Sequence, residues 1–354
     1  MAAPVLAHLG VPAFGIGGNA LRRAGLELTT HLAELTAMGF GGVLARAPRI
    51  VHAALRLLRD ARRRRPAAAL LVGYSEFNAL LGPRLRRRGV RVLWYGAPQI
   101  WAWRSRRAQA IARACDRLAT ILPFEPSVWR SHGVVAEYVG HPALERVRGE
   151  RDLIRAGLGL ASPAECVALL PGSRPHEVRR HVDLMLGALR LLRAERGAVD
   201  ARLIIAPSLG DHLTSKLKRR ARQAGVEPID IDAAGVLRAF DVALAASGTV
   251  TLECVVADVP PVVVYKTGLV TELLARSLLR VQDIALPNLV LGERIFPELV
   301  QRQATAQAAA DQASRLLDER GTMTDACARV RGALELSGGV PSERVARMMA
   351  PWLW

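Results

Sequence analysis

Two short loops combine glycine with hydroxyl and charged side chains, as a phosphate-binding turn requires. The first, PGSR at 171–174, follows the apolar run 166–170, and a helical pattern begins after it. Gly172 allows a tight turn and a close approach of a ligand to the backbone. Free N–H groups at a helix start capped by Ser173, together with the Arg174 guanidinium, would bind phosphate oxygens. The alternative is an ordinary strand-to-helix turn with a serine cap.

The second loop, at Ser247, Gly248 and Thr249, ends another apolar run, and Glu253 follows one helical turn later. A glycine turn with two hydroxyls suits the phosphates of a nucleotide, and a carboxylate suits the ribose hydroxyls. Both loops follow predicted strands, and the carboxyl ends of parallel strands meet at one edge of a sheet. The two loops therefore predict a single nucleotide-binding crevice.

Other catalytic motifs are absent from the sequence. It contains no Walker A sequence, no H-E-x-x-H and no G-x-S-x-G, and its eight histidines are scattered. The four cysteines have no paired spacing, which argues against a zinc site and a disulfide framework. FGIGGNA at 14–20 is rich in glycine but lacks the spacing of a dinucleotide-binding turn. We expect neither a metal nor a cofactor.

Short apolar runs alternate with stretches of helical period, which predicts βαβ units with parallel sheets. The runs are apolar almost throughout, as in strands buried on both faces. Strands are expected at 11–16, 68–72, 90–95, 117–122, 135–139, 165–170, 201–206, 241–246 and 260–264. Helices are expected at 48–64, 76–88, 104–114, 174–195, 210–224, 249–257, 304–319, 323–336 and 341–349. No strand is expected beyond about residue 296.

The length of 354 residues favours two domains. A polar, charged segment, GHPALERVRGERD, separates two series of strand and helix patterns. We expect one α/β domain over 1–145, a second over 146–330, and C-terminal helices over 331–354.

The net charge of +17 is concentrated in the first part of the chain. Residues 1–150 contain 23 Arg, no Lys and 9 acidic residues, whereas the remainder contains 26 basic and 23 acidic residues. Trp101 and Trp103 precede a basic run that begins at Arg104, and Trp129 follows, a combination that suits an anionic bilayer surface. Burial of these tryptophans in a core is the alternative. Because no nucleic-acid-binding module is evident, we expect no nucleic acid partner.

Eight motifs along the chain are considered together. They are WAWR at 101–104, ILPFE at 121–125, VGHP at 139–142, LLPGSR at 169–174, ASGTVTLE at 246–253, VVVYK at 262–266, LPNLVLG at 286–292 and FPELVQ at 296–301. Their order and spacing resemble those of the lipid-A-disaccharide synthase family of GT-B glycosyltransferases. The resemblance covers nearly the whole chain. It implies a GT-B fold, with two Rossmann-like domains facing each other across a cleft and a C-terminal helical tail.

The resemblance also implies an activity and its residues. The reaction is an inverting transfer of 2,3-diacylglucosamine from UDP-2,3-diacylglucosamine to 2,3-diacylglucosamine 1-phosphate, which gives lipid A disaccharide 1-phosphate and UDP. Donor binding falls to residues of the second domain, namely Gly172, Ser173, Arg174, Ser247, Gly248, Thr249, Glu253 and Asn288. Membrane and acceptor binding falls to Trp101, Trp103 and Arg104 in the first domain.

Two differences from the family lie in the acceptor domain. Family members open with a strand and a turn resembling A-G-E-x-S-G-D, whereas this chain is expected to start with the rear of the following helix, at about 2–9, and to lack that strand and loop. A family stretch resembling G-I-D-A-P-D-F-N corresponds to GYSEFN at 73–78, which is two residues shorter. Glu76 matches the second acid of that stretch, and the first has no counterpart. An inverting transfer requires a base, and Glu76 is the residue expected for it.

The implied location is the cytoplasm, peripheral on the inner face of the inner membrane of a Gram-negative bacterium, with a homodimer as a further expectation. No apolar stretch is long enough for a membrane-spanning helix. Two alternatives are a non-catalytic or altered-specificity relative that binds a UDP-sugar or lipid, and another GT-B enzyme such as a UDP-sugar epimerase.

Overall fold

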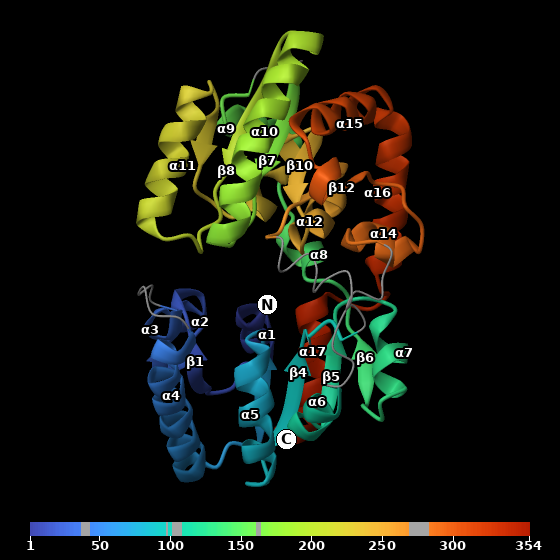
Figure 1. Ribbon diagram of the computed structural model, residues 1–354. Helices are drawn as coiled ribbons and strands as arrows, with labels where there is room; N and C mark the ends of the chain where they lie inside the picture. Colours follow the sequence, from blue (N-terminus) through green and yellow to red (C-terminus); the bar gives the residue numbers. More distant parts are fainter. Residues whose placement is uncertain (37–42, 97, 101–107, 161–163, 269–282) are drawn as a thin grey trace. The chain divides into compact units, whose positions relative to one another are not determined.

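The computed structural model describes residues 1–36, 43–96, 98–100, 108–160, 164–268 and 283–354. The chain divides into unit 1, residues 1–142 with 336–354, and unit 2, residues 143–335 (Figure 1). We expected the first domain to end at residue 145 and the second at residue 330. The structure also differs in the last helix, which belongs to unit 1 and does not form a separate tail.

Unit 1 alternates strands and helices. Its strands are β1 (Phe14–Gly17), β2 (Glu27–His31), β3 (Ala68–Val72), β4 (Arg91–Tyr95), β5 (Arg117–Thr120) and β6 (Ala136–Tyr138). Its helices are α1 (Ala2–Leu9), α2 (Asn19–Arg23), α3 (Leu32–Thr36), α4 (Val43–Arg64), α5 (Ser75–Arg86), α6 (Ala108–Ala114), α7 (Glu125–Arg130) and α17 (Pro341–Met349), which the 3-10 turn η5 (Ala350–Trp352) follows. The helix expected at about 2–9 is confirmed as α1.

The strands of unit 1 form a parallel pair, β1-β2, and a parallel four-stranded sheet in the order β3-β4-β5-β6. Side chains of a strand alternate between the two faces of its sheet, and β4 shows this clearly. Val92 and Trp94 pack in a core with α5 and α6, whereas Leu93 and Tyr95 pack in a second core with α1 and α17. Both faces of the sheet are therefore covered.

The cover on the second face comes from opposite ends of the chain. Val5 of α1 lies in the same buried cluster as Val345 and Met349 of α17. The four-stranded sheet presents apolar residues on this face, so helices must cover it to remove that area from water. The C-terminal helix thus completes a core whose buried strand residues come from β4 and β5.

Unit 2 contains the second α/β series. Its strands are β7 (Glu165–Leu170), β8 (Val199–Ile204), β9 (Glu227–Ile229), β10 (Val242–Ala246), β11 (Pro261–Tyr265) and β12 (Glu298–Val300). Its helices are α8 (Ala143–Arg146), α9 (Arg151–Gly157), α10 (Pro175–Arg196), α11 (Asp211–Gln223), α12 (Val250–Val256), α14 (Leu286–Leu291), α15 (Ala306–Asp318) and α16 (Arg320–Leu334), with 3-10 turns η2 (Ala233–Gly235), η3 (Leu237–Ala239) and η4 (Gln301–Gln303).

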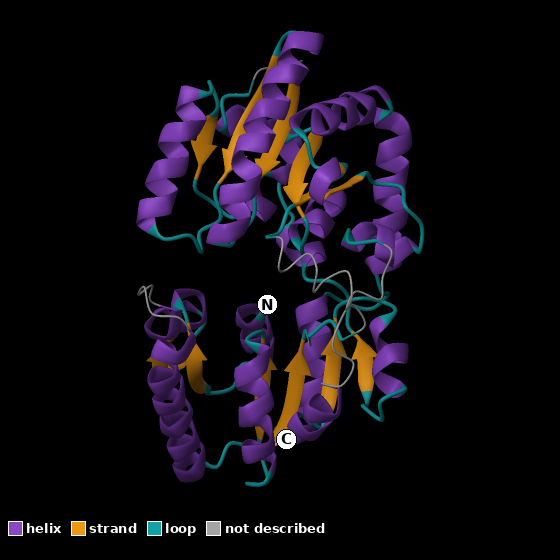
Figure 2. Ribbon diagram, viewed as in Figure 1, coloured by secondary structure: helices purple, strands orange, loops and turns teal. Residues whose placement is uncertain are grey.

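The sheet of unit 2 is parallel and has the strand order β12-β11-β10-β7-β8-β9. Counted from the first strand of the unit, this is the doubly wound 3-2-1-4-5-6 order. Helices lie on both faces of the sheet (Figure 2), and every residue of β10 is buried. The expectation that these apolar runs are strands covered on both faces is confirmed.

The nine expected strands are all present, with ends shifted by up to three residues. The structure adds three strands that were not expected, which are β2, β9 and β12. The expectation that strands stop near residue 296 is wrong, because β12 pairs with β11 at the edge of the sheet. The short edge strands β9 and β12 span three residues each, too few to show a period.

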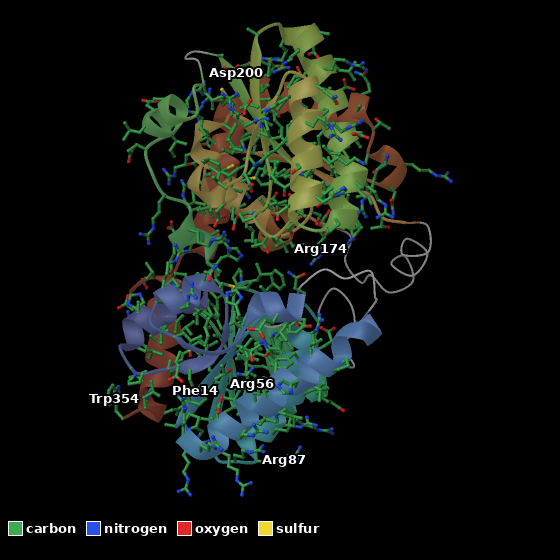
Figure 3. The ribbon with its side chains drawn as sticks, turned by 90° about the vertical axis from the view of Figure 1, so that its left-hand side faces the viewer. Phe14, Arg56, Arg87, Arg174, Asp200 and Trp354 are labelled. Carbon is green, nitrogen blue, oxygen red and sulfur yellow. The ribbon has the colours of Figure 1, made fainter. Side chains whose placement is uncertain are left out.

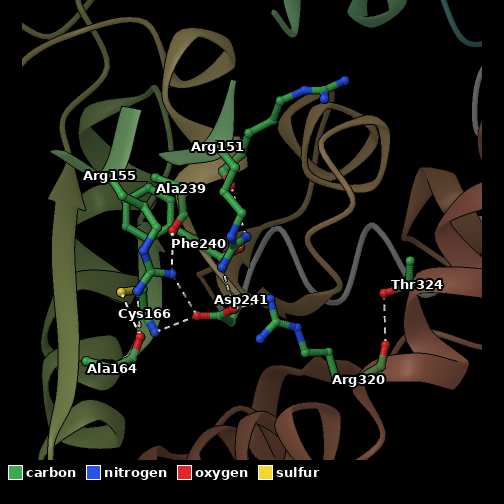
Figure 4. A network of polar contacts seen from close by, with 10 residues as sticks. Arg151, Arg155, Ala164, Cys166, Ala239, Phe240, Asp241, Arg320 and Thr324 are labelled. Atoms are coloured by element: carbon green, nitrogen blue, oxygen red, sulfur yellow. Dashed lines mark hydrogen bonds and ion pairs between the residues drawn. The ribbon is translucent and has the colours of Figure 1, made fainter. Parts of the chain in front are cut away.

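A buried aspartate, Asp241, joins four elements at the amino ends of the two central strands (Figure 4). Its Oδ2 accepts a hydrogen bond from the Cys166 backbone N–H at 2.8 Å, which links β10 to β7. Its Oδ1 lies 2.6 Å from Nη2 of Arg151 on α9 and 2.7 Å from Nη2 of Arg320, the first residue of α16. Arg155 makes a longer contact of 3.5 Å with Oδ2. One carboxylate therefore anchors two helices to the sheet.

We expect Asp241→Asn to destabilise unit 2 by about 3 kcal/mol, because it leaves partly buried guanidinium groups without their counter-charge. Urea unfolding followed by circular dichroism would measure the loss. All six tryptophans lie within the sequence of unit 1, so their fluorescence provides an internal reference.

The matched control is Asp183→Asn, which removes the charge of an exposed partner of Arg220. Exposed ion pairs contribute about 0–1 kcal/mol, so this variant should unfold close to the parent. Equal losses in the two variants would contradict the anchoring role of Asp241.

Candidate nucleotide site

The strand order of unit 2 brings the two predicted phosphate loops together. β7 pairs with β10 in parallel, with Leu170 opposite Ala245. The chain leaves both strands at the same edge of the sheet, and the connections from these two strands run to opposite faces. This is the switch point at which doubly wound sheets bind their ligands. The loops 171–174 and 247–249 therefore flank one position.

The first loop is closed by the carboxylate of Glu177 rather than by a serine. Its Oε2 accepts hydrogen bonds from the backbone N–H groups of Ser173 and Arg174, each at 3.2 Å. The helix begins at Pro175 with Arg174 as its N-cap, so the expectation that Ser173 caps the helix is wrong. The Glu177 carboxylate thus already accepts hydrogen bonds from two backbone N–H groups at the start of α10.

Gly172 is required by this arrangement. Its φ of +119° is a conformation that side chains rarely adopt, and a Cβ there would lie 2.7 Å from a Glu177 carboxylate oxygen. The Arg174 side chain projects from the loop with 69% of its surface exposed, and its Nη1 contacts Glu177 Oε1 at 2.6 Å (Figure 3). A guanidinium has five N–H donors, so others remain for an anion.

A histidine that sequence reasoning missed connects this loop to a neighbouring strand. His181 is fully buried; its Nδ1 lies 3.0 Å from the Pro171 carbonyl oxygen, and its Nε2 lies 3.0 Å from the Lys266 backbone nitrogen. Since the carbonyl can only accept and the N–H can only donate, the ring is neutral with its proton on Nδ1. Burial lowers the pKa of His181, in agreement with this state. Its spacing from the buried Val178 and Val182 places it on the inner face of α10.

The second loop is held by its own hydroxyl groups and by a distant carbonyl. Ser247 Oγ donates to the Ile284 carbonyl at 3.0 Å, and Thr251 Oγ1 donates to the Gly248 carbonyl at 2.7 Å. Thr249 is exposed at the start of α12 and makes no side-chain cap. Gly248 has a φ of +151°, which also favours glycine.

The acid predicted for the ribose, Glu253, is buried below this loop. Its side chain is 6% exposed, and its Oε1 contacts Nη1 of Arg146. Burial raises the pKa of Glu253 to about 7, the neighbouring Arg146 opposes this, and Asp232 adds to the increase. A carboxyl group whose pKa is shifted by burial and by a specific charged partner is a candidate for a functional site.

Asn288 has a structural position instead of an open one. It is fully buried; its Oδ1 accepts from the Ile295 and Phe296 backbone N–H groups, and its Nδ2 donates to the Phe296 carbonyl and to Glu298. Glu298 in turn accepts from the N–H groups of Ile284 and Ala285. Since Ser247 bonds the Ile284 carbonyl, these contacts connect Asn288 to the second loop, which it supports. Both donors and both acceptor positions of the Asn288 side-chain amide are used in these bonds.

The residues of unit 1 that were predicted to function have different outcomes in the structure. Glu76 is exposed in the first turn of α5, after Gly73 and Tyr74, whose positive φ values turn the chain out of β3. Trp101, Trp103 and Arg104 lie outside the described residues. Trp129 is fully buried in the core, so the expectation that it contributes to a membrane surface is wrong.

No group of three or more His, Cys, Asp or Glu side chains suited to a metal is found among the residues that the structure describes. A search of the same residues finds no helix with the length and apolar character to cross a bilayer.

Known structures share this fold. The UDP-GlcNAc 2-epimerase from Neisseria meningitidis bound to UDP-GlcNAc superposes with a TM-score of 0.68 at 10% identity, over 99% of this chain and 95% of that one. A glycosyltransferase from Rickettsia africae ESF-5 gives a TM-score of 0.55 at 8% identity, over 99% and 93% of the two chains. The predicted GT-B class, α/β with parallel sheets, is confirmed.

Sequence relatives are closer. The lipid-A-disaccharide synthase of Anaeromyxobacter dehalogenans (strain 2CP-C) is 40% identical over 323 residues, which is 91% of this chain and 84% of that protein. The enzyme of Myxococcus xanthus (strain DK1622) is 37% identical over 348 residues, or 96% and 90% of the two chains. The family model for lipid-A-disaccharide synthetase matches residues 5–343. The resemblance read from the motifs is thereby confirmed: the chain belongs to the lipid-A-disaccharide synthase family, the glycosyltransferases of lipid A biosynthesis.

Proposed function

We propose that this chain transfers 2,3-diacylglucosamine from UDP-2,3-diacylglucosamine to 2,3-diacylglucosamine 1-phosphate with inversion, forming lipid A disaccharide 1-phosphate and UDP. The observation that carries the proposal is the pair of glycine loops at the switch point of unit 2, with the buried Glu253 beside the second. Family membership supports a UDP-sugar as the donor.

The donor site divides by chemistry. Gly172, Ser173 and the exposed Arg174 would hold the diphosphate, because backbone proximity and a guanidinium suit phosphate oxygens. Ser247, Gly248 and Thr249 would line the same nucleotide from the second loop. Asn288 would act through the Glu298 bonds that hold this loop.

In the reaction the acceptor hydroxyl attacks the anomeric carbon as the bond from that carbon to the diphosphate oxygen breaks. UDP leaves with the electron pair, and the hydroxyl proton passes to a base. Arg174 would stabilise the charge that develops on the leaving diphosphate. Glu76, an exposed carboxylate of unit 1, is our proposal for the base.

Unit 1 would also meet the membrane that carries the acylated substrates. On α4, Val51 and Leu55 are 55% and 56% exposed, and Arg59 and Arg62 continue the same helical stripe. Figure 3 shows another arginine of this helix, Arg56. Apolar side chains among arginines suit the interface of an anionic bilayer. This supports a peripheral location on the inner face of the inner membrane, with Trp101, Trp103 and Arg104 as further contacts.

Arg174→Ala should reduce the affinity for UDP at least about tenfold. The variant loses a charge-assisted contact to the diphosphate, worth about 1.5–3 kcal/mol. Isothermal titration calorimetry of the parent and the variant measures the change. Arg179→Ala, on an exposed position of the same helix, is the matched control. Unchanged UDP binding in Arg174→Ala, or no binding in the parent, would remove this site.

Glu76→Gln should lower the rate of disaccharide formation by about 10²–10⁴ while UDP affinity stays the same, because a base acts only in the chemical step. The disaccharide is followed by mass spectrometry, with Glu137→Gln as an exposed control in unit 1. A rate within a factor of two of the parent would show that another group accepts the proton.

Arg59→Ala and Arg62→Ala should each weaken binding to anionic vesicles about fivefold, since each arginine near such a surface contributes about 1 kcal/mol. Added salt should weaken binding of the parent as well. Sedimentation with phosphatidylglycerol vesicles measures the bound fraction, and Arg219→Ala on the exposed side of α11 is the control. Equal binding to neutral and anionic vesicles would refute this surface.

A further inference from the structure

An arginine outside both loops contacts Glu253, the buried acid of the proposed nucleotide site. Arg146, the last residue of α8, directs its guanidinium between two carboxylates. Nη1 contacts Glu253 Oε1, and Nη2 lies 2.7 and 2.8 Å from the two oxygens of Asp232. Asp232 itself caps the turn η2 through the Ala234 N–H. Asp232 therefore fixes one side of the Arg146 guanidinium, and the other side of the guanidinium contacts Glu253.

This contact uses only one of the two Glu253 oxygens. Among the described residues, Oε2 accepts no hydrogen bond, whereas Oε1 is bound to Arg146. α12 packs against both α8 and η2, so the buried Glu253 carboxylate lies beneath Arg146 and Asp232, whose side chains reach the surface. Glu253 is thus fixed in orientation with one oxygen still available.

We propose that Arg146 is a positioning residue of the ribose subsite, which favours the ionised form of Glu253 and leaves its second oxygen to accept hydrogen bonds from the ribose hydroxyls of a uridine nucleotide. The inference rests on the proposed donor site and extends it to a residue of the segment just before the second domain's sheet. Arg146 acts through Glu253 and does not contact the nucleotide.

The proposal has a consequence for pH. An ionised carboxylate accepts from both hydroxyls of a ribose, whereas a protonated one loses an acceptor site. With a pKa of about 7 for Glu253, nucleotide affinity should rise as the pH increases through neutrality. Arg146 lowers that pKa, so its removal should move the midpoint of the rise to higher pH.

The groups around Glu253 support a single titration. Arg146 on α8 and Asp232 before η2 are the charged groups acting on it within the described structure. The thiols of Cys254 on its own helix and of Cys327 on α16 are buried, and burial raises the pKa of each far above neutrality. These thiols stay neutral over the pH range in which Glu253 ionises.

The experiment is a calorimetric titration between pH 5.5 and 8.5 with two probes, UDP and 2′,3′-dideoxy-UDP, which lacks both ribose hydroxyls. For the parent we expect UDP to bind more tightly as the pH rises. The dideoxy compound should bind more weakly and show only the smaller pH dependence that the terminal phosphate, with a second pKa of about 6, gives to both probes. Arg146→Ala should shift the UDP midpoint upward by about one pH unit or more, since each pKa unit is a tenfold change in equilibrium. Arg146→Lys keeps a positive charge beside Glu253, so its midpoint should lie between those of the parent and of Arg146→Ala.

Arg148→Ala is the matched control, because Arg148 is an exposed neighbour that bonds only the Glu145 carbonyl among the described residues. Glu253→Gln should reduce the pH dependence of UDP binding to that of the dideoxy compound, which identifies Glu253 as the titrating group. Thermal unfolding confirms that each variant is folded. Asp232→Asn removes a negative charge that raises the pKa of Glu253, so this variant should shift the midpoint to lower pH, opposite to Arg146→Ala.

The outcomes separate the two proposals. If UDP does not bind the parent, the proposed donor site is wrong and this inference falls with it. If UDP binds, but the midpoint and the preference over the dideoxy compound are the same in Arg146→Ala as in the parent, Arg146 has no positioning role and the donor site stands.

Discussion

The parallel pairing of β7 with β10 is the constraint on which unit 2 depends. These neighbours in the sheet are separated by more than seventy residues of sequence, and they carry the two glycine loops of the proposed nucleotide site at their carboxyl ends. Asp241 joins the same strands at their amino ends and holds α9 and α16 against them. Because strands in one sheet are rigidly spaced, an anchor at one end fixes the separation of the loops at the other.

Carboxylates accept hydrogen bonds from the backbone at three turns of the chain. Glu177 accepts from two N–H groups of the first loop, Glu298 accepts from two that precede α14, and in unit 1 Glu125 accepts from the N–H groups of Ile121 and Leu122. A buried N–H without a partner is costly, and these loops lie where the sheet can no longer supply one. Much of the loop geometry is therefore built before any ligand arrives.

Glu253 differs from these carboxylates in its chemistry. Glu177 and Glu298 each bond backbone N–H groups, whereas Glu253 faces a guanidinium with one oxygen and has the other available among the described residues. Burial without backbone donors raises the pKa of Glu253 to about 7. Its counter-charge is the Arg146 guanidinium on α8, which lowers the same pKa.

Local pattern by itself determined nine strands, the longer helices and the two glycine loops, because periodicity, glycine turns and apolar runs are properties of neighbouring residues. It also located Gly172, Arg174, Gly248 and Glu253. The strand order agrees with the prediction that the two loops lie at one edge of a sheet. Only the tertiary structure decided that Asn288 is a support, that Trp129 is core and that α17 returns to unit 1. The pairing of Arg146 with Glu253 spans 107 residues, and no local pattern records which distant strands and helices a buried face or charge will meet.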